Sequence, residues 1–280
     1  MPLYEGRLGH QFNHRFASQP NGRLSEVTID QRANPGFSVE PQYWVSLTEA
    51  EQRFERYRTK CKSGLLGFRR VARNTDERTS IASLLPWGAA SYGWILVLGP
   101  DALDLLLLLG TFNSFPFDYL LRNALSQPSI PQGTFEQIPC PPPDAFTPAT
   151  RQMLLPQLLE LTYTAWDLEP FAKDCGYDGS PFRWDEERRF LLRCELDAAY
   201  FHLYGIERDD VDYIMETFPI VKRKDEQQFR EYRTRRVILE IYDEMKRAMD
   251  AGEPYLTGLE PPPADQSVAH LSGEKANIQL

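Results

Sequence analysis

The chain has 280 residues, of which 42% are hydrophobic and 25% are charged, so it is long enough to form one large domain or two modest ones. The longest apolar run, residues 94–112, is interrupted by Pro100, Asp101 and Asp104, and the first residues lack the pattern of a secretion signal, so we expect no membrane partner and a cytoplasmic location. The formal net charge of −9 argues against binding of nucleic acid through bulk positive charge, because phosphate contacts require clustered Lys and Arg.

The charge is unevenly distributed along the chain. Lys and Arg outnumber Asp and Glu in residues 1–80, whereas acidic residues outnumber basic ones in the remainder. Any basic surface that contacts a nucleic acid is therefore expected mainly in residues 1–80.

The first part of the chain predicts a connector. Residues 1–37 are rich in Gly and Pro and show little apolar periodicity, which is typical of irregular chain. Residues 43–46 predict a short strand, and residues 48–62 predict a charged amphipathic helix with Thr48 as its N-cap.

A small mixed sheet is expected next. Residues 65–72, 80–86 and 92–98 are apolar or β-branched runs separated by Gly, Pro or polar residues, and each predicts a strand. Asp101 predicts the N-cap of a Leu-rich helix that continues to residue 109, and a second helix is expected at residues 115–125.

A Pro-rich stretch separates this part from a mainly helical one. Residues 128–143 cannot form a regular helix and mark the best candidate domain boundary. Residues 252–280 lack apolar periodicity and predict a disordered tail. Between them, apolar residues at helical spacing predict helices at residues 154–166, 184–204, 208–217 and 226–249.

The expected fold class is therefore α+β, with a small mixed-sheet domain followed by a mainly α-helical domain. The expected divisions are a connector at residues 1–37, the sheet domain at 38–143, the helical domain at 144–251 and the tail at 252–280.

One set of basic and amide side chains is concentrated around a predicted strand and the turn after it. Arg and Asn make bidentate contacts with guanine and adenine edges, and Arg and Lys also bind phosphates. The alternative is a solvated basic edge that contacts no ligand. The set consists of Lys60, Lys62, Arg69, Arg70, Arg73, Asn74 and Arg78.

The motifs for adenine methyl transfer are not found in the sequence. The nearest string to an Asn/Asp-Pro-Pro-aromatic tetrad, at residues 34–37, lacks the second proline and predicts a turn. Asp243, Glu244 and Lys246 superficially match the end of a nuclease motif, but they fall within a predicted helix, where an exposed charged face is the simpler explanation. The four cysteines are too widely spaced for a zinc site, so we expect neither a metal site nor a catalytic residue.

Several strings spread over most of the chain carry a resemblance to a known family, and their order makes it more specific than any one of them. They are PLYEG at residues 2–6, HQFNHRF at 10–16, GFRRVARNTDERT at 67–79, NSFPFDY at 113–119, FEQIP at 135–139, LTYTAWDL at 161–168 and the long string over residues 182–214. In these strings the chain resembles the C-terminal half of type IIG restriction–modification enzymes and related adenine-specific DNA methyltransferases, including the large methylases of phage-defence islands.

The resemblance implies that DNA recognition and methyl transfer are carried out by different modules. The part that ends in the Gln-Ile-Pro string at residues 137–139 resembles a target-recognition domain, and the helical remainder resembles a supporting region. Residues 126–134 depart from the family, because relatives carry a Gly-rich turn and hydrophobic residues there. Met1 stands where the catalytic domain of such enzymes ends, so methyl transfer is expected from a separate catalytic module. That module would bind S-adenosylmethionine, and this chain is expected to bind no cofactor itself.

We therefore expect the chain to read double-stranded DNA for an adenine-N6 DNA methyltransferase of a restriction–modification system, and to present the target adenine to the catalytic methylase module. The basic set would read the DNA, with Arg122 and Asn123 as phosphate contacts and with His14 and Arg15 at the junction with the catalytic module. The alternative is a non-catalytic protein-interaction scaffold in a phage-defence complex.

Overall fold

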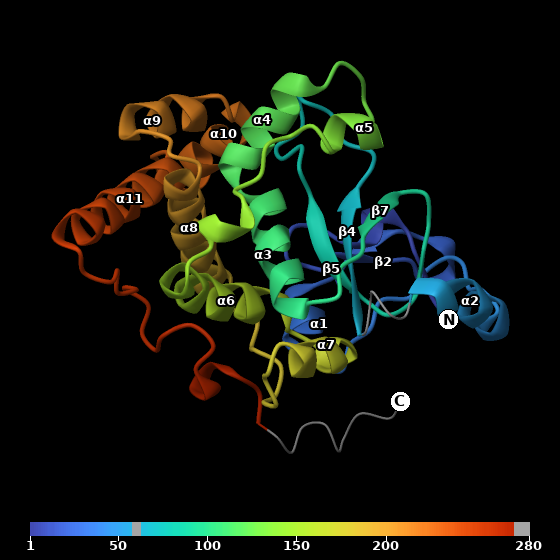
Figure 1. The fold of residues 1–280 in the computed structure, drawn as a ribbon. Coiled ribbons are helices and arrows are strands. Elements are labelled where there is room, and N and C mark those ends of the chain that lie inside the picture. Colours follow the sequence, from blue (N-terminus) through green and yellow to red (C-terminus); the bar gives the residue numbers. More distant parts are fainter. Residues whose placement is uncertain (58–62, 272–280) are drawn as a thin grey trace.

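A computed structural model describes residues 1–57 and 63–271. The described chain is α+β, as the sequence predicts: a small antiparallel sheet lies beside a larger set of helices (Figure 1). Lys60 and Lys62, two of the predicted DNA-binding residues, lie outside the described residues.

The main sheet has three strands. Its central strand β4 (Gly64–Arg69) pairs antiparallel with β5 (Ala82–Pro86) on one side and with β7 (Trp94–Val97) on the other. The three strands predicted in this region are thus confirmed, although each is shorter than its apolar run. Both faces of β4 are buried: Leu66 belongs to the large hydrophobic core, and Leu65 to a smaller cluster on the opposite face.

Residues 1–37 are not an irregular connector but part of the folded body. The short strand β1 (Leu3–Tyr4) pairs in parallel with β6 (Ala89–Ala90), and Tyr4 is buried beside Trp94 in the smaller cluster. A Cβ added at Gly6 would lie 2.7 Å from the carbonyl oxygen of Gly93, so this close approach of two backbones requires glycine. The segment also contains η1 (Gly6–Leu8), β2 (Ala17–Ser18), η2 (Pro20–Gly22), β3 (Ser25–Glu26) and α1 (Ile29–Ala33).

The predicted strand at residues 43–46 is reduced to an isolated bridge between Trp44 and Pro2. The helix expected to begin after Thr48 begins earlier, as α2 (Leu47–Phe54), and is followed by η3 (Glu55–Tyr57). Ser46 occupies the N-cap position of α2 but makes no capping hydrogen bond with its side chain.

The two helices after the sheet are confirmed as α3 (Ala102–Asn113) and α4 (Phe115–Ala124). Asp101 caps α3 as predicted, because its carboxylate accepts the backbone N–H of Asp104 at 3.0 Å. The Pro-rich stretch contains a single helical turn, α5 (Gln132–Phe135), which fits between the prolines that flank it.

The predicted helices at residues 184–204 and 208–217 are confirmed, whereas the helix predicted at 154–166 begins and ends earlier, and a short helix at 169–174 was not predicted. The continuous pattern at residues 226–249 belongs to two helices, because Arg230 adopts a left-handed conformation with φ of 64° and ends the first of them. The elements are η4 (Pro143–Ala145), α6 (Pro148–Thr162), η5 (Trp166–Leu168), α7 (Glu169–Asp174), α8 (Glu186–Leu203), α9 (Arg208–Glu216), α10 (Pro219–Phe229) and α11 (Arg233–Ala251).

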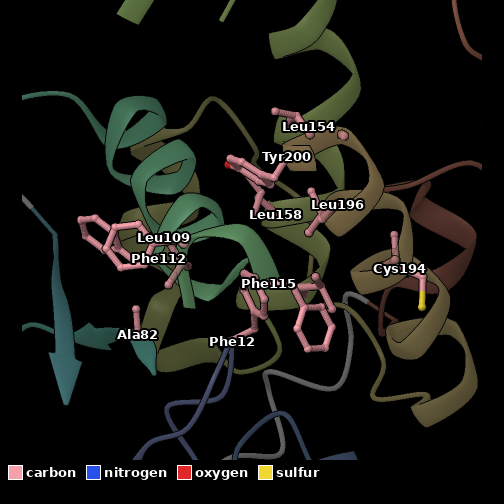
Figure 2. Close-up of a cluster of buried hydrophobic side chains, with 14 of the residues drawn as sticks. Phe12, Ala82, Leu109, Phe112, Phe115, Leu154, Leu158, Cys194, Leu196 and Tyr200 are labelled. Atoms are coloured by element: carbon pink, nitrogen blue, oxygen red, sulfur yellow. The ribbon is translucent and has the colours of Figure 1, made fainter. Parts of the chain in front are cut away.

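One large hydrophobic core crosses the Pro-rich stretch. Helix α3 lies between the three-stranded sheet and helices α6 and α8 (Figure 1). Leu109 of α3, Leu158 of α6 and Tyr200 of α8 meet there (Figure 2), and the Tyr200 hydroxyl donates to the carbonyl of Leu107 at 2.8 Å. The sheet part and the helical part therefore share a core, and the predicted boundary near residue 143 does not separate two cores.

The segment after α11 is ordered as far as the structure describes it, unlike the disordered tail that the sequence predicts. The hydroxyls of Tyr255 and Thr257 donate to the buried carboxylate of Glu195, and the backbone N–H of Ala264 donates to Glu160 at 2.8 Å. Polar contacts hold this segment in place, together with the buried side chain of Leu259, so its lack of apolar periodicity did not indicate disorder. The segment ends in η6 (Gln266–Val268).

Candidate nucleic-acid interface

The predicted DNA-binding segment begins where β4 leaves the sheet. The backbone N–H of Arg70 donates to the carbonyl of Gly93 at 3.0 Å, and its carbonyl accepts the N–H of Ile130 at 2.7 Å. The Arg70 guanidinium lies 3.9 Å from the ring centroid of Tyr92, whose side chain is 74% exposed. Stacking on this ring holds the cation at the surface in a defined orientation.

The turn that follows presents Arg73 and Asn74 to solvent and is fixed through its backbone. The N–H of Arg73 donates to the carboxylate of Asp76 at 2.9 Å, and the carbonyl of Arg73 accepts the hydroxyl of Thr79 at 3.0 Å. The Asn74 amide makes one long contact, 3.4 Å, with the carbonyl of Leu125. Both side chains are exposed, so their donor groups remain accessible. We call the surface formed by Arg70, Arg73, Asn74 and Tyr92 the arginine rim.

Arg78 and Arg122 point inward, although the sequence predicts both as DNA-binding residues. They share Asp118 of α4, which is fully buried: the Nε of Arg78 lies 2.7 Å from one carboxylate oxygen, and the Nε of Arg122 lies 3.4 Å from the other. The side chains of the two arginines are only 10% and 9% exposed. Their guanidiniums also lie 4.0 Å and 3.9 Å from the rings of Phe115 and Phe218, respectively. These contacts engage both guanidiniums within the fold.

This buried ionic junction fixes the base of the turn. Asp118 accepts the backbone N–H of Thr79, and Arg122 donates to the backbone carbonyls of Asp76 and Glu77 at 3.4 and 3.3 Å. Burial is the main reason that the pKa of Arg122 is lowered, and Asp118 opposes that shift. Arg78 and Arg122 thus position the arginine rim from beneath.

The other predicted contacts divide between the surface and the interior. Arg69 is partly buried, and burial lowers its pKa, against the effect of Asp76. Asn123 is exposed on α4, but its amide donates to the carbonyl of Tyr119 one turn earlier at 2.7 Å.

His14 and Arg15 lie at a junction within this chain. The Arg15 guanidinium is buried and donates to four backbone carbonyls. They belong to Arg32, Asn34 and Phe37 in the N-terminal segment and to Thr164 before η5. Desolvation lowers the pKa of Arg15 to about 10. His14 contacts Asp167 through Nε2 at 2.9 Å. Both residues therefore fasten the N-terminal segment to the helical part.

The residues that resemble catalytic motifs make structural contacts. In the string at residues 34–37, the Asn34 side chain accepts the N–H of Gly36 at 2.9 Å, which makes a turn as predicted. Asp243 pairs with Arg208 across α9 and α11, and Lys246 pairs with Asp250 one turn along α11. Within residues 1–57 and 63–271, no group of three or more His, Cys, Asp or Glu side chains is placed to hold a metal ion. No helix in the same residues has the length and apolar composition needed to cross a membrane.

Sequence reasoning missed Tyr92. An aromatic residue beside Gly93 in the turn before a strand was the available signal, but only the folded sheet shows that this turn lies next to the end of β4.

Comparisons of the chain with protein-family models, with curated proteins and with solved structures found no match.

Proposed function

We propose that the chain binds double-stranded DNA through the arginine rim, as the sequence-reading part of an adenine-N6 DNA methyltransferase of the restriction–modification kind. The single observation that carries the proposal is how these side chains are presented: Arg70 stacks on Tyr92, and Arg73 and Asn74 are exposed on a turn whose backbone is fixed. Arg and Asn are the side chains that recognise guanine and adenine edges in the major groove. The family resemblance of the string at residues 67–79 supports the same assignment.

Rigidity of the turn favours a recognition role over a solvated edge. The backbone around Arg73 is fixed by Asp76 and Thr79, and the ionic junction around Asp118 holds the base of the turn. Side chains presented from an ordered backbone lose less conformational entropy on binding than those on a mobile loop. A solvated basic edge that binds no ligand would not require these contacts to order its backbone.

The proposal assigns recognition to this chain and methyl transfer to a partner. A separate catalytic methylase module would bind S-adenosylmethionine and receive the target adenine after it leaves the helical stack. The net charge of −9 fits a local DNA contact made by a few cations better than a broad basic surface.

The experiment measures binding of the full chain to a mixed-sequence duplex by fluorescence anisotropy between about 50 and 200 mM salt. We expect affinity to fall as salt rises, and we expect Arg73→Ala to lower the slope of log affinity against log salt by roughly 0.9 for each phosphate that Arg73 neutralises. Arg247→Ala is the matched control, because Arg247 is exposed on α11 and belongs neither to the arginine rim nor to the ionic junction.

Two results would contradict the proposal. One is no duplex binding at any of these salt concentrations, which is the behaviour of a protein-interaction scaffold. The other is equal weakening by Arg73→Ala and Arg247→Ala, which would mean that the rim has no special part in DNA binding.

A further inference from the structure

The aromatic ring of Tyr92 in the arginine rim is more exposed than its contact with Arg70 requires. The Arg70 guanidinium lies over the ring at 3.9 Å from its centroid, yet the side chain of Tyr92 remains 74% exposed. Among the described residues, Arg70 is the cation on this ring, and no second aromatic ring stacks on it. A side chain covered on both faces would not retain this exposure, so the face opposite to Arg70 is open to solvent.

The turn that carries Tyr92 is fixed to the rest of the fold. The backbone N–H of Ser91 donates to the carbonyl of Tyr4 at 2.8 Å, and the N–H of Gly93 donates to the hydroxyl of Ser91 at 3.2 Å. Gly93 approaches Gly6 so closely that an added Cβ would lie 2.8 Å from the Gly6 nitrogen. The ring is therefore presented from an ordered backbone, which lowers the conformational entropy lost when a flat ligand stacks on it.

A flat ring with one open face can stack on a nucleobase. Aromatic side chains stack on bases that have left the helix, and every base offers a π face for this contact. A base inside a duplex is not available, because its paired neighbours in the stack cover it. Arg73, three residues after Arg70, is exposed and supplies positive charge for a nearby phosphate. The ligand that fits is DNA with an unpaired base.

We propose that Tyr92 stacks on an unpaired base of DNA, with the base on the face of the ring opposite to Arg70. This inference rests on the proposed function, because it assumes that the arginine rim contacts DNA. It adds the class of DNA that the rim prefers, a duplex in which one base has left the stack. In the proposed methyltransferase, Tyr92 would act as a positioning residue that stabilises the DNA while a base is outside the helix.

The test compares three duplexes of the same sequence by fluorescence anisotropy with the full chain. The first is fully paired, the second carries one bulged adenine, and the third carries an abasic site in place of that adenine. The abasic duplex keeps the flexibility of the bulge but offers no base to the ring. We expect the bulged-adenine duplex to bind about tenfold to a hundredfold more tightly than either of the others, which is the factor expected from stacking of one base on an aromatic side chain.

Three variants assign the preference to the ring. Tyr92→Leu should lower the affinity for the bulged-adenine duplex to that for the abasic duplex, whereas Tyr92→Phe keeps the ring and should keep the preference. The ratio of affinities is the readout, because loss of the support that Tyr92 gives to Arg70 would weaken binding of all three duplexes alike. Tyr213→Leu is the matched control, because Tyr213 is 62% exposed on α9 and does not belong to the arginine rim.

The possible failures are distinguishable. Equal affinity of the unaltered chain for all three duplexes would overturn this inference and leave the proposed DNA contact standing. The inference also fails if Tyr92→Leu retains the preference for the bulged adenine, because another residue would then hold the base. Binding of none of the three duplexes would contradict both proposals.

Discussion

The arginine rim and the buried ionic junction are built from the same short run of sequence, yet they are opposite in character. Arg73 is exposed and bonded only through its backbone, whereas Arg78 is almost fully buried on Asp118. The carboxylate that separates the two roles lies 40 residues further along the chain, on α4. Arginines in one basic run can therefore serve recognition and architecture side by side, and the difference depends on which of them meets a buried acid.

The largest effect should come from the junction. Asp118→Asn removes the charge that two buried guanidiniums share, and we expect the free energy of unfolding to fall by about 3–5 kcal/mol, because each cation is left without its counter-charge. Urea denaturation followed by circular dichroism measures the change. Asp178→Asn is the control, because Asp178 is exposed in the loop after α7 and should change stability by less than about 0.5 kcal/mol.

A decrease below about 1 kcal/mol in Asp118→Asn would contradict the contrast between the exposed rim and the buried junction, because an unpaired buried charge should cost more than that. It would mean that Arg78 and Arg122 are held by their aromatic and backbone contacts alone, and that the rim does not depend on the ionic junction beneath it.

Local sequence patterns were sufficient for most of the fold. The runs that became β4, β5 and β7 alternate or persist in apolar residues, and the Asp101 cap marked the start of α3. The patterns were insufficient where the local structure depends on contacts that the sequence pattern does not show. The break at Arg230 lies inside an unbroken helical pattern, and the segment after α11 is held by hydrogen bonds to buried carboxylates that no periodicity reveals.

The candidate site could be predicted in composition but not in orientation. Residue types alone identified the run that holds Arg70, Arg73 and Asn74, yet they could not separate these residues from Arg78, because the burial of Arg78 depends on Asp118 in another element.

Asp197 is a second buried carboxylate, but it lacks the ion pairs that Asp118 has. Burial raises its pKa from 3.8 to about 6, although Arg78 and Arg193 oppose the shift. The folded state then binds the proton more tightly than the unfolded state, so the contribution of Asp197 to stability should fall as pH rises from about 4 to about 6. Asp197→Asn should remove this slope, which amounts to about 2–3 kcal/mol across the window.

Denaturation of the unaltered chain and of Asp197→Asn at several pH values measures that difference. The asparagine side-chain oxygen can still accept the N–H of Phe115, so the variant preserves the hydrogen bond and changes only the titration. Parallel stability profiles for the two proteins would show that Asp197 titrates at an ordinary pKa in the fold.

The smallest effect should come from the rim, where the contact between Arg70 and Tyr92 lies at the surface. A double-mutant cycle with Arg70→Met and Tyr92→Leu should give a coupling energy of about 0.5–1 kcal/mol, because an exposed cation–π pair is weakened by water. Urea denaturation of the two single variants and the double variant provides the cycle. A coupling of zero would mean that Tyr92 does not hold the Arg70 guanidinium, and the rim would then present two independently mobile cations instead of one fixed and one free.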